Sequence, residues 1–358
     1  MKFSLFFEMQ IANPTRASEA QTFRDCVEQA VLADQLGYHT IWEVEHHGLY
    51  EYSHSSAPEV FLAFVAAKTR NVRLGHGITL TPYRYNHPIR IAERVATLDI
   101  LSGGRVSWGS GKSSSRTEQL AFENDVNQIH DQWLEALEMI PRMWQQDVFE
   151  WKGRHFQIPP TQVIPKPVQE PHPPIFAACS KPESAVEVGK LGIGALNFAV
   201  GNDLYLGKKV SEYRKAVAAA RPAAYAKNDH FACTPVALCL DDDREACRYG
   251  MRGANFFAES LATYYFSGKR PTGVLRGVSR DFLPDDELAE AMAFRGSVDA
   301  PAMNVIGDPA HCREIVSRYA KVGVDELILV MQAGTVPHAL VMESIRTFGE
   351  KVIPHFAT

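Results

Sequence analysis

The chain lacks any run of about 18 consecutive apolar residues, so no membrane-spanning helix is expected. The apolar N-terminal run ends at Glu8 without a small-residue cleavage site, which favours a first buried strand over a signal peptide. A strong charge of one sign is also missing. The net charge of -5 and the pI near 6.2 argue against nucleic acid and anionic membrane surfaces as partners.

Cysteine is scarce, with six residues in 358 and no CxxC pair. We therefore expect free thiols in a reducing cytoplasm and no metal site. No GxGxxG motif opens a helix, which weighs against a Rossmann dinucleotide site.

Apolar strands alternate with amphipathic helices along the whole chain. Near-continuous apolar runs of this kind predict parallel strands that are buried on both faces. A single (β/α)8 barrel with insertions, spanning residues 1–358 as one domain, fits this pattern best. The alternative is a doubly wound open sheet. The eight expected strands cover residues 2–7, 39–44, 72–80, 106–109, 174–179, 195–200, 230–240 and 326–331.

Two segments interrupt the repeat, at 147–173 and 267–304. Loops of this length are commonly lids or binding loops. Aromatic residues in and near them could line an apolar substrate pocket or could equally pack in the core. These residues are Tyr50, Tyr52, Phe149, Trp151, Tyr264, Tyr265 and Phe266.

The second expected strand leads into Glu45-His46-His47. Ligands bind at the carboxyl ends of barrel strands, and imidazole titrates near neutral pH. Side chains alternate along a strand, so only one of the two histidines is expected to face the cavity, and Glu45 could pair with either. Alternation also makes a metal site from consecutive residues implausible.

The third strand contains two glycines, Gly75 and Gly77. Glycine inside a strand usually marks close approach of a ligand or of another backbone. Both explanations, a flat ligand and tight barrel packing, remain open.

The loops after the fourth and fifth strands are rich in phosphate-binding groups. Residues 109–116 combine glycines, serines, Lys112 and Arg116, and Ser180 precedes a helix whose N-cap it is expected to form. Together the two loops could hold one phosphate. A solvated polar turn would explain the first loop as well.

Four segments resemble those of the bacterial luciferase-like monooxygenases. Glu45-His46-His47 ends a W-x-x-E-H-H segment, and 75–80 resembles the family's third strand. Residues 86–105 resemble its HPxxxAE…LDxLSxGR signature, and 306–309 with 323–327 resemble its C-terminal pattern.

The resemblance implies a (β/α)8 barrel that forms a homodimer and binds reduced FMN from a separate flavin reductase. Oxygen then adds to the flavin at C4a, and the resulting peroxide oxygenates a small, apolar organic substrate. His46, supported by Glu45, is the implied catalytic residue, as base or as stabiliser of the peroxyflavin. The family often has a non-prolyl cis peptide at the position of Gly77-Ile78. The implied cofactor-binding residues are Gly77, Ile78, Thr79, Gly111, Lys112, Ser113, Cys179 and Ser180.

Two positions depart from luciferase itself. Gly111 replaces a reactive cysteine, and Cys179 replaces a glutamate, so physiological bioluminescence is not expected. Two alternatives stay open: an oxidoreductase that transfers hydride with a deazaflavin or flavin on the same barrel, and a non-catalytic flavin-binding relative.

Overall fold

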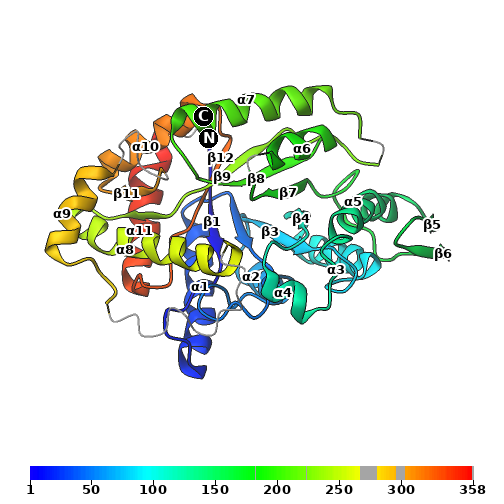
Figure 1. The fold of residues 1–358 in the computed structure, drawn as a ribbon, viewed down its shortest axis with the longest axis horizontal. Coiled ribbons are helices and arrows are strands. Elements are labelled where there is room, and N and C mark those ends of the chain that lie inside the picture. Colours follow the sequence, from blue (N-terminus) through cyan, green and yellow to red (C-terminus); the bar gives the residue numbers. More distant parts are fainter. Residues whose placement is uncertain (182, 223, 267–279, 296–302, 357–358) are drawn as a thin grey trace.

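A closed barrel of eight parallel strands forms the centre of the computed structural model (Figure 1), which describes residues 1–356 without 182, 223, 267–279 and 296–302. The strand order around the described barrel is β1-β12-β9-β8-β7-β4-β3-β2. The predicted (β/α)8 barrel is thereby confirmed, and the doubly wound open sheet is wrong. The barrel strands are β1 (Lys2–Phe7), β2 (Thr40–Glu43), β3 (Arg73–Leu80), β4 (Val106–Gly111), β7 (Ile175–Cys179), β8 (Gly194–Phe198), β9 (Phe231–Thr234) and β12 (Glu326–Leu329).

Helices connect the strands and surround the barrel (Figure 1). Local sequence sets their ends. In α3, for example, Pro88 occupies the first turn and Gly103 ends the helix in the left-handed conformation, with φ of 68°. The long connecting helices are α1 (Arg16–Gln35), α2 (Pro58–Lys68), α3 (Pro88–Ser102), α5 (Ile129–Gln145), α6 (Ser184–Leu191), α7 (Asp203–Ala219), α8 (Asp243–Leu261), α10 (Pro309–Lys321) and α11 (His338–Lys351).

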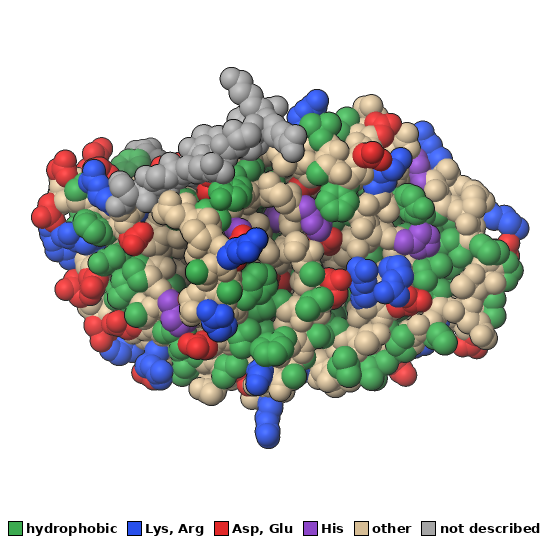
Figure 2. Space-filling view, turned by 90° about the horizontal axis from the view of Figure 1, so that it is seen from below, with side chains coloured by type: hydrophobic (Ala, Val, Ile, Leu, Met, Phe, Trp, Pro, Cys, Tyr) green, Lys and Arg blue, Asp and Glu red, His purple; other side chains and the backbone are tan. Residues whose placement is uncertain are grey.

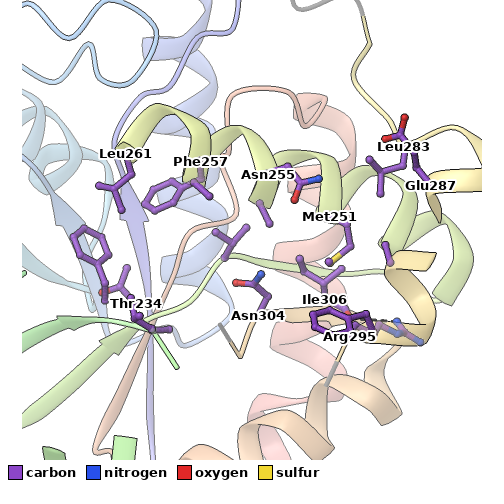
Figure 3. Close-up of a pocket in the computed structure, with 18 of the residues that line it drawn as sticks. Thr234, Met251, Asn255, Phe257, Leu261, Leu283, Glu287, Arg295, Asn304 and Ile306 are labelled. Carbon is purple, nitrogen blue, oxygen red and sulfur yellow. Dashed lines mark hydrogen bonds between the residues drawn. The ribbon is translucent and has the colours of Figure 1, made fainter. Parts of the chain in front are cut away.

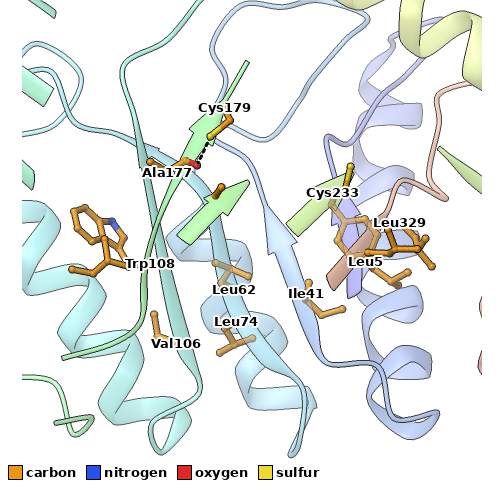
Figure 4. Close-up of a cluster of buried hydrophobic side chains, with 14 of the residues drawn as sticks. Leu5, Ile41, Leu62, Leu74, Val106, Trp108, Ala177, Cys179, Cys233 and Leu329 are labelled. Carbon is orange, nitrogen blue, oxygen red and sulfur yellow. Dashed lines mark hydrogen bonds between the residues drawn. The ribbon is translucent and has the colours of Figure 1, made fainter. Parts of the chain in front are cut away.

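Apolar side chains from the strands and the surrounding helices form the core, part of which is shown in Figure 4. Leu74 of β3 and Leu62 of α2 are both fully buried there. All six cysteines lie within the described residues, and each is buried and unpaired, as expected from their spacing.

The expected strand 230–240 is two strands rather than one. Proline has no N–H to donate to a sheet, and Pro235 follows β9 directly. Beyond it, β10 (Ala237–Cys239) leaves the barrel and pairs with β11 (Val305–Gly307) in a separate parallel sheet.

The segment 147–173 contains an antiparallel hairpin of β5 (Phe149–Lys152) and β6 (Gln157–Thr161). Phe149 is 1% exposed, and the indole Nε1 of Trp151 donates to Glu135 of α5 at 2.8 Å. Of the two alternatives left open for these aromatic residues, packing is therefore correct, because both belong to the core on the outer side of the barrel and not to a substrate pocket.

The segment 267–304 also has regular structure, because α9 (Asp285–Phe294) lies within it. Its stretches 267–279 and 296–302, and the side chain of Phe266, lie outside the described residues. At the end of α8, the π-helix η1 (Ala262–Phe266) continues toward the carboxyl ends of the strands. None of the helices in the described part of the chain has the length and apolarity needed to cross a membrane.

Candidate active site

A cavity of about 550 Å³ opens at the carboxyl ends of the barrel strands. Six barrel strands, β1, β2, β3, β4, β7 and β8, contribute to its wall through their carboxyl-terminal residues or the loops that follow them, and Tyr265 of η1 completes one side. The lining includes Phe6, Glu8, Val44, His46, Gly77, Ile78, Leu80, Gly111, Lys112, Ser113, Ser114, Ala178, Ser180, Lys181, Phe198 and Tyr265.

His46 is held in this wall by partners on both ring nitrogens. Its Nδ1 lies 2.8 Å from Oε1 of Glu118, and its Nε2 lies 3.0 Å from the Tyr265 hydroxyl and 3.7 Å from Oε2 of Glu8. The Tyr52 hydroxyl donates to the other oxygen of Glu8 at 2.8 Å. The imidazole is thus fixed between two carboxylates and two phenols.

The two carboxylates control the charge of the imidazole. Burial lowers the pKa of His46, but Glu118 and Glu8 outweigh this effect and raise the pKa to about 9. Burial raises the pKa of Glu8 to about 7, against the pull of His46. At neutral pH His46 is therefore an imidazolium, which suits a hydrogen-bond donor better than a base.

Glu118 lies on the short helix α4 (Arg116–Ala121) and is held by the loop that precedes it. Ser113, in the left-handed conformation with φ of 65°, donates to Oε2 of Glu118 at 2.6 Å. The backbone N–H of His47 donates to Oε1 at 2.9 Å. A non-glycine residue in this conformation is uncommon and is often found at functional sites.

Neither Glu8 nor Glu118 was identified from the sequence. Glu8 carries a usable signal, because it is a charged residue placed directly after an apolar strand. Glu118 lies in a helix of six residues with no motif around it, and only the fold brings it to His46.

Glu45 and His47 face away from the cavity. Oε2 of Glu45 accepts from the backbone N–H of Leu80 at 2.8 Å, and Oε1 accepts from Asn86 at 2.8 Å and lies 3.2 Å from His47. The His47 ring packs against Phe122, with centroids 4.6 Å apart. His46 lines the cavity and His47 does not, which is the arrangement that alternation of side chains predicts. Glu45 binds the end of β3 and is not part of the cavity wall.

The loops after β4 and β7 meet at the polar end of the cavity, as predicted. Lys112, Ser113, Ser114, Ser180 and Lys181 all line it, and the hydroxyls of Ser114 and Ser180 lie 3.4 Å apart. The predicted N-cap role of Ser180 is wrong, because α6 begins later, at residue 184.

Lys112 occupies a partly buried position beside α5. Its Nζ lies 2.7 Å from Nδ1 of His130 and 4.9 Å from the centre of the Trp133 ring. Burial lowers the pKa of Lys112. The side chain is thereby oriented along the cavity wall, where its charge can meet a phosphate.

The glycines of β3 serve two different purposes. A Cβ on Gly75 would lie 2.3 Å from the Trp42 ring, so this glycine is required by barrel packing. Gly77 lines the cavity, and Ile78 covers Gly111, where a Cβ would come within 2.5 Å of the isoleucine Cδ1.

The register between β3 and β4 shifts between His76 and Thr79. Thr79 is mostly buried and is not among the residues that line the cavity. Within the described residues the cis peptide bonds precede Pro165 and Pro171, so the expected non-prolyl cis bond at Gly77-Ile78 is not found.

Cys179 lies outside the cavity, in the apolar core (Figure 4). Its neighbours Ala178 and Ser180 face the cavity, which puts the intervening thiol on the other side of β7. Burial raises the pKa of Cys179 to about 12, so the thiol stays protonated. Among the side chains that the structure describes, no cluster of three His, Cys, Asp or Glu residues could hold a metal ion.

Comparison with known proteins identifies close similarities. The sequence profile of the luciferase-like monooxygenases matches residues 1–326. The oxygenase component of the flavin-dependent trigonelline monooxygenase of Acinetobacter baylyi is 35% identical over 188 residues, which are 51% of this chain and 50% of that protein. The F420-dependent hydroxymycolic acid dehydrogenase of Mycobacterium tuberculosis is 33% identical over 172 residues, 47% of each protein. This chain therefore matches about half the length of these relatives. Monooxygenase RslO1 from Streptomyces bottropensis has a similar structure, with a TM-score of 0.82, 26% identity and coverage of 100% of both chains.

Proposed function

Because this chain belongs to the luciferase-like monooxygenase family, we propose that it is the oxygenase component of a two-component flavin-dependent monooxygenase. In this proposal it is a cytoplasmic homodimer of single-domain barrels that takes reduced FMN from a separate flavin reductase. Its substrates are O2 and a small, apolar organic molecule. The relative from Acinetobacter baylyi, described as a flavin-dependent oxygenase component, supports this assignment.

The cavity has suitable surfaces for FMN. At its polar end, Lys112, Lys181 and the neighbouring serine hydroxyls supply the cationic and hydrogen-bonding groups that a phosphate requires. The opposite part of the wall is apolar or lacks side chains, with Phe6 and Gly77 among its residues, and so accommodates a flat ring. Oε2 of Glu8 is buried in this wall without a hydrogen-bond partner in the described part of the chain, which favours a bound polar group beside it.

Reduced FMN, when bound, supplies the two electrons with which one atom of O2 enters the substrate and the other leaves as water. The chain itself provides a cation, His46, and a phenol, Tyr265, in the wall of the cavity that would hold the flavin. His46 stays protonated because Glu118 and Glu8 flank it, and it can stabilise negative charge that develops on oxygen. Tyr265 contacts His46 and the cavity, so it can relay a proton between them.

The observation that carries the proposal is the position of His46, flanked by Glu8 and Glu118, in the wall of a cavity whose polar end carries Lys112, Lys181 and serine hydroxyls. Oxygen chemistry requires stabilisation of developing negative charge in a site shielded from water. The W-x-x-E-H-H segment alone does not provide a positive charge for this purpose. The buried carboxylates of Glu8 and Glu118 do so indirectly, because they keep His46 protonated.

Hydride transfer with the deazaflavin F420 is the second candidate. The F420-dependent relative from Mycobacterium tuberculosis, at 33% identity, supports it. Hydride transfer needs no oxygen, so the two candidates differ in both the preferred cofactor and the dependence on O2.

The test is an anaerobic titration of the purified protein with photoreduced FMN and, separately, with reduced F420, followed by exposure to oxygen. The proposal predicts tighter binding of reduced FMN and oxygen consumption by the complex. Tighter binding of F420, with no reaction of the bound cofactor with oxygen, would instead support hydride transfer and would overturn the monooxygenase proposal.

A further inference from the structure

A second cavity, of about 520 Å³, lies between α8, α9 and the ends of the neighbouring strands (Figure 3). Its volume falls within the range of roughly 300–1,000 Å³ typical of small-molecule sites. We call it the α8–α9 cavity. Its walls are mainly apolar, with Met251, Ala254, Phe257 and Leu261 from α8, Ala291 from α9, and Ile306 from β11.

The α8–α9 cavity adjoins the proposed flavin cavity at one side chain. Phe198, at the end of β8, lines both cavities, and its ring contacts that of Phe257 edge to face, with centroids 6.1 Å apart. Leu261 lines one cavity and Tyr265, four residues further on, lines the other. A molecule in the α8–α9 cavity therefore lies next to the site where oxygen would react.

Polar groups in the α8–α9 cavity define which ligands it can accept. Asn255 and Asn304 are neutral and can each donate or accept a hydrogen bond (Figure 3). Arg295 is the cation of the lining, but both of its terminal nitrogens already bind the carboxylate of Asp243, at 2.7 and 2.5 Å.

Acidic side chains lie at the edge of the same cavity. Glu287 and Glu290 are exposed residues of α9 that contribute to the lining. Their charge repels anions, while the apolar walls offer nothing to replace the hydration of a charged group.

We infer that the α8–α9 cavity is the binding chamber for the organic substrate, and that this substrate is an uncharged, largely hydrocarbon molecule with one or two hydrogen-bonding groups. The inference rests on the proposed function, since it assigns the chamber to the molecule that is oxygenated. Phe198 is then the boundary across which the reacting end of the substrate reaches the flavin cavity.

The inference can be tested with the methyl group of Met251 as a local reporter. The full-length protein is labelled with [13C-methyl]methionine, and the Met251 signal is assigned with a Met251→Leu variant. Octan-1-ol is then titrated as the neutral probe and octanoate as the anionic probe of equal chain length. We expect octan-1-ol to shift the Met251 signal saturably and to bind at least tenfold more tightly than octanoate.

A matched pair of α9 variants locates the binding site. Ala291 lines the cavity, whereas Ala289, two residues earlier on the same helix, is exposed and does not. Ala291→Trp should weaken octan-1-ol binding at least tenfold, and Ala289→Trp should leave it unchanged. Equal effects of the two variants, or octanoate binding as tightly as octan-1-ol to the wild-type protein, would overturn the inference. The comparison of the two probes needs no variant and so does not depend on the folding of Ala291→Trp.

Anaerobic binding of reduced FMN to the same samples separates this inference from the proposed function. If FMN binds and octan-1-ol does not shift the Met251 methyl signal, the assignment of the α8–α9 cavity as the substrate chamber is wrong and the proposed function stands. If octan-1-ol binds in the α8–α9 cavity but FMN does not bind, the proposed function is wrong and with it the role of the chamber in oxygenation.

Discussion

The charge of His46 depends on Glu118, and the variant Glu118→Gln tests this dependence. The substitution keeps an oxygen beside Nδ1, at the place where the carboxylate now lies 2.8 Å away, but removes its charge. A hydrogen bond to a charged group contributes about 1.5–3 kcal/mol, compared with about 0.5–1.5 kcal/mol for a neutral one. A difference of about 1.4 kcal/mol corresponds to one pKa unit, so the pKa of His46 should fall from about 9 to roughly 8.

The assay is an NMR titration of the His46 ring protons, assigned with a His46→Gln variant. Glu123→Gln is the matched control, because Glu123 is an exposed carboxylate nearby in the chain whose ion pair is with Arg84. It should leave the pKa of His46 unchanged. A His46 pKa below 7 in the wild-type protein, or one that does not respond to Glu118→Gln, would refute the electrostatic account of the site.

Three further results are expected. Lys112→Ala should weaken binding of reduced FMN by roughly 1.5–3 kcal/mol in an anaerobic titration, if the lysine holds the phosphate. Gly75→Ala should destabilise the fold by about 1–3 kcal/mol in urea unfolding, because its Cβ would meet the Trp42 ring, whereas Gly207→Ala, with its nearest neighbour 3.4 Å away, should not destabilise it. The folded-state pKa of His46 is raised, so its contribution to stability is complete below about pH 6.5 and is lost as the pH rises through about 9. Urea unfolding of the wild-type protein should therefore show a loss of up to about 3 kcal/mol over this interval, and His46→Ala should reduce that loss.

The barrel could be predicted from the sequence because its strands are buried on both faces and read as continuous apolar runs. The hairpin in 147–173 could not, since prolines lie within and beside its strands, and its pairing depends on contacts with α5 such as that between Trp151 and Glu135. The prediction of one strand over 230–240 was wrong because Pro235, which cannot donate to a sheet, separates β9 from β10.

In the segment 86–105, which resembles the family's HPxxxAE…LDxLSxGR signature, Asp99 and Arg105 make structural contacts. Asp99 accepts from the backbone N–H groups of Val168 and Gln169, and Arg105 donates to backbone carbonyls such as those of Ala66 and Val72. These hydrogen bonds connect α3 to the segment before β7, and the residue before β4 to α2 and to the segment before β3. A motif of this kind identifies a fold without naming the residues that do chemistry.

The active-site residues were predictable where strand alternation applies. Alternation predicts that only one of His46 and His47 faces the cavity, and the family resemblance selects His46, which lines it. The same rule applied to β7 would have separated Ser180 from Cys179. Glu118 could not be predicted, because the conformation of the loop at Ser113 brings its carboxylate to the His46 imidazole, 72 residues away in the sequence.

The central claim is that a protonated His46 in this cavity controls the reaction of bound reduced FMN with oxygen. The most direct measurement is rapid mixing of the anaerobic FMN complex with oxygen, recording the return of oxidised-flavin absorbance. In the wild-type protein this return should lag well behind the consumption of oxygen, and His46→Ala should shorten the lag by roughly 10²–10⁴-fold while reduced FMN still binds. An equal lag in both proteins, or none in the wild type, would contradict the claim.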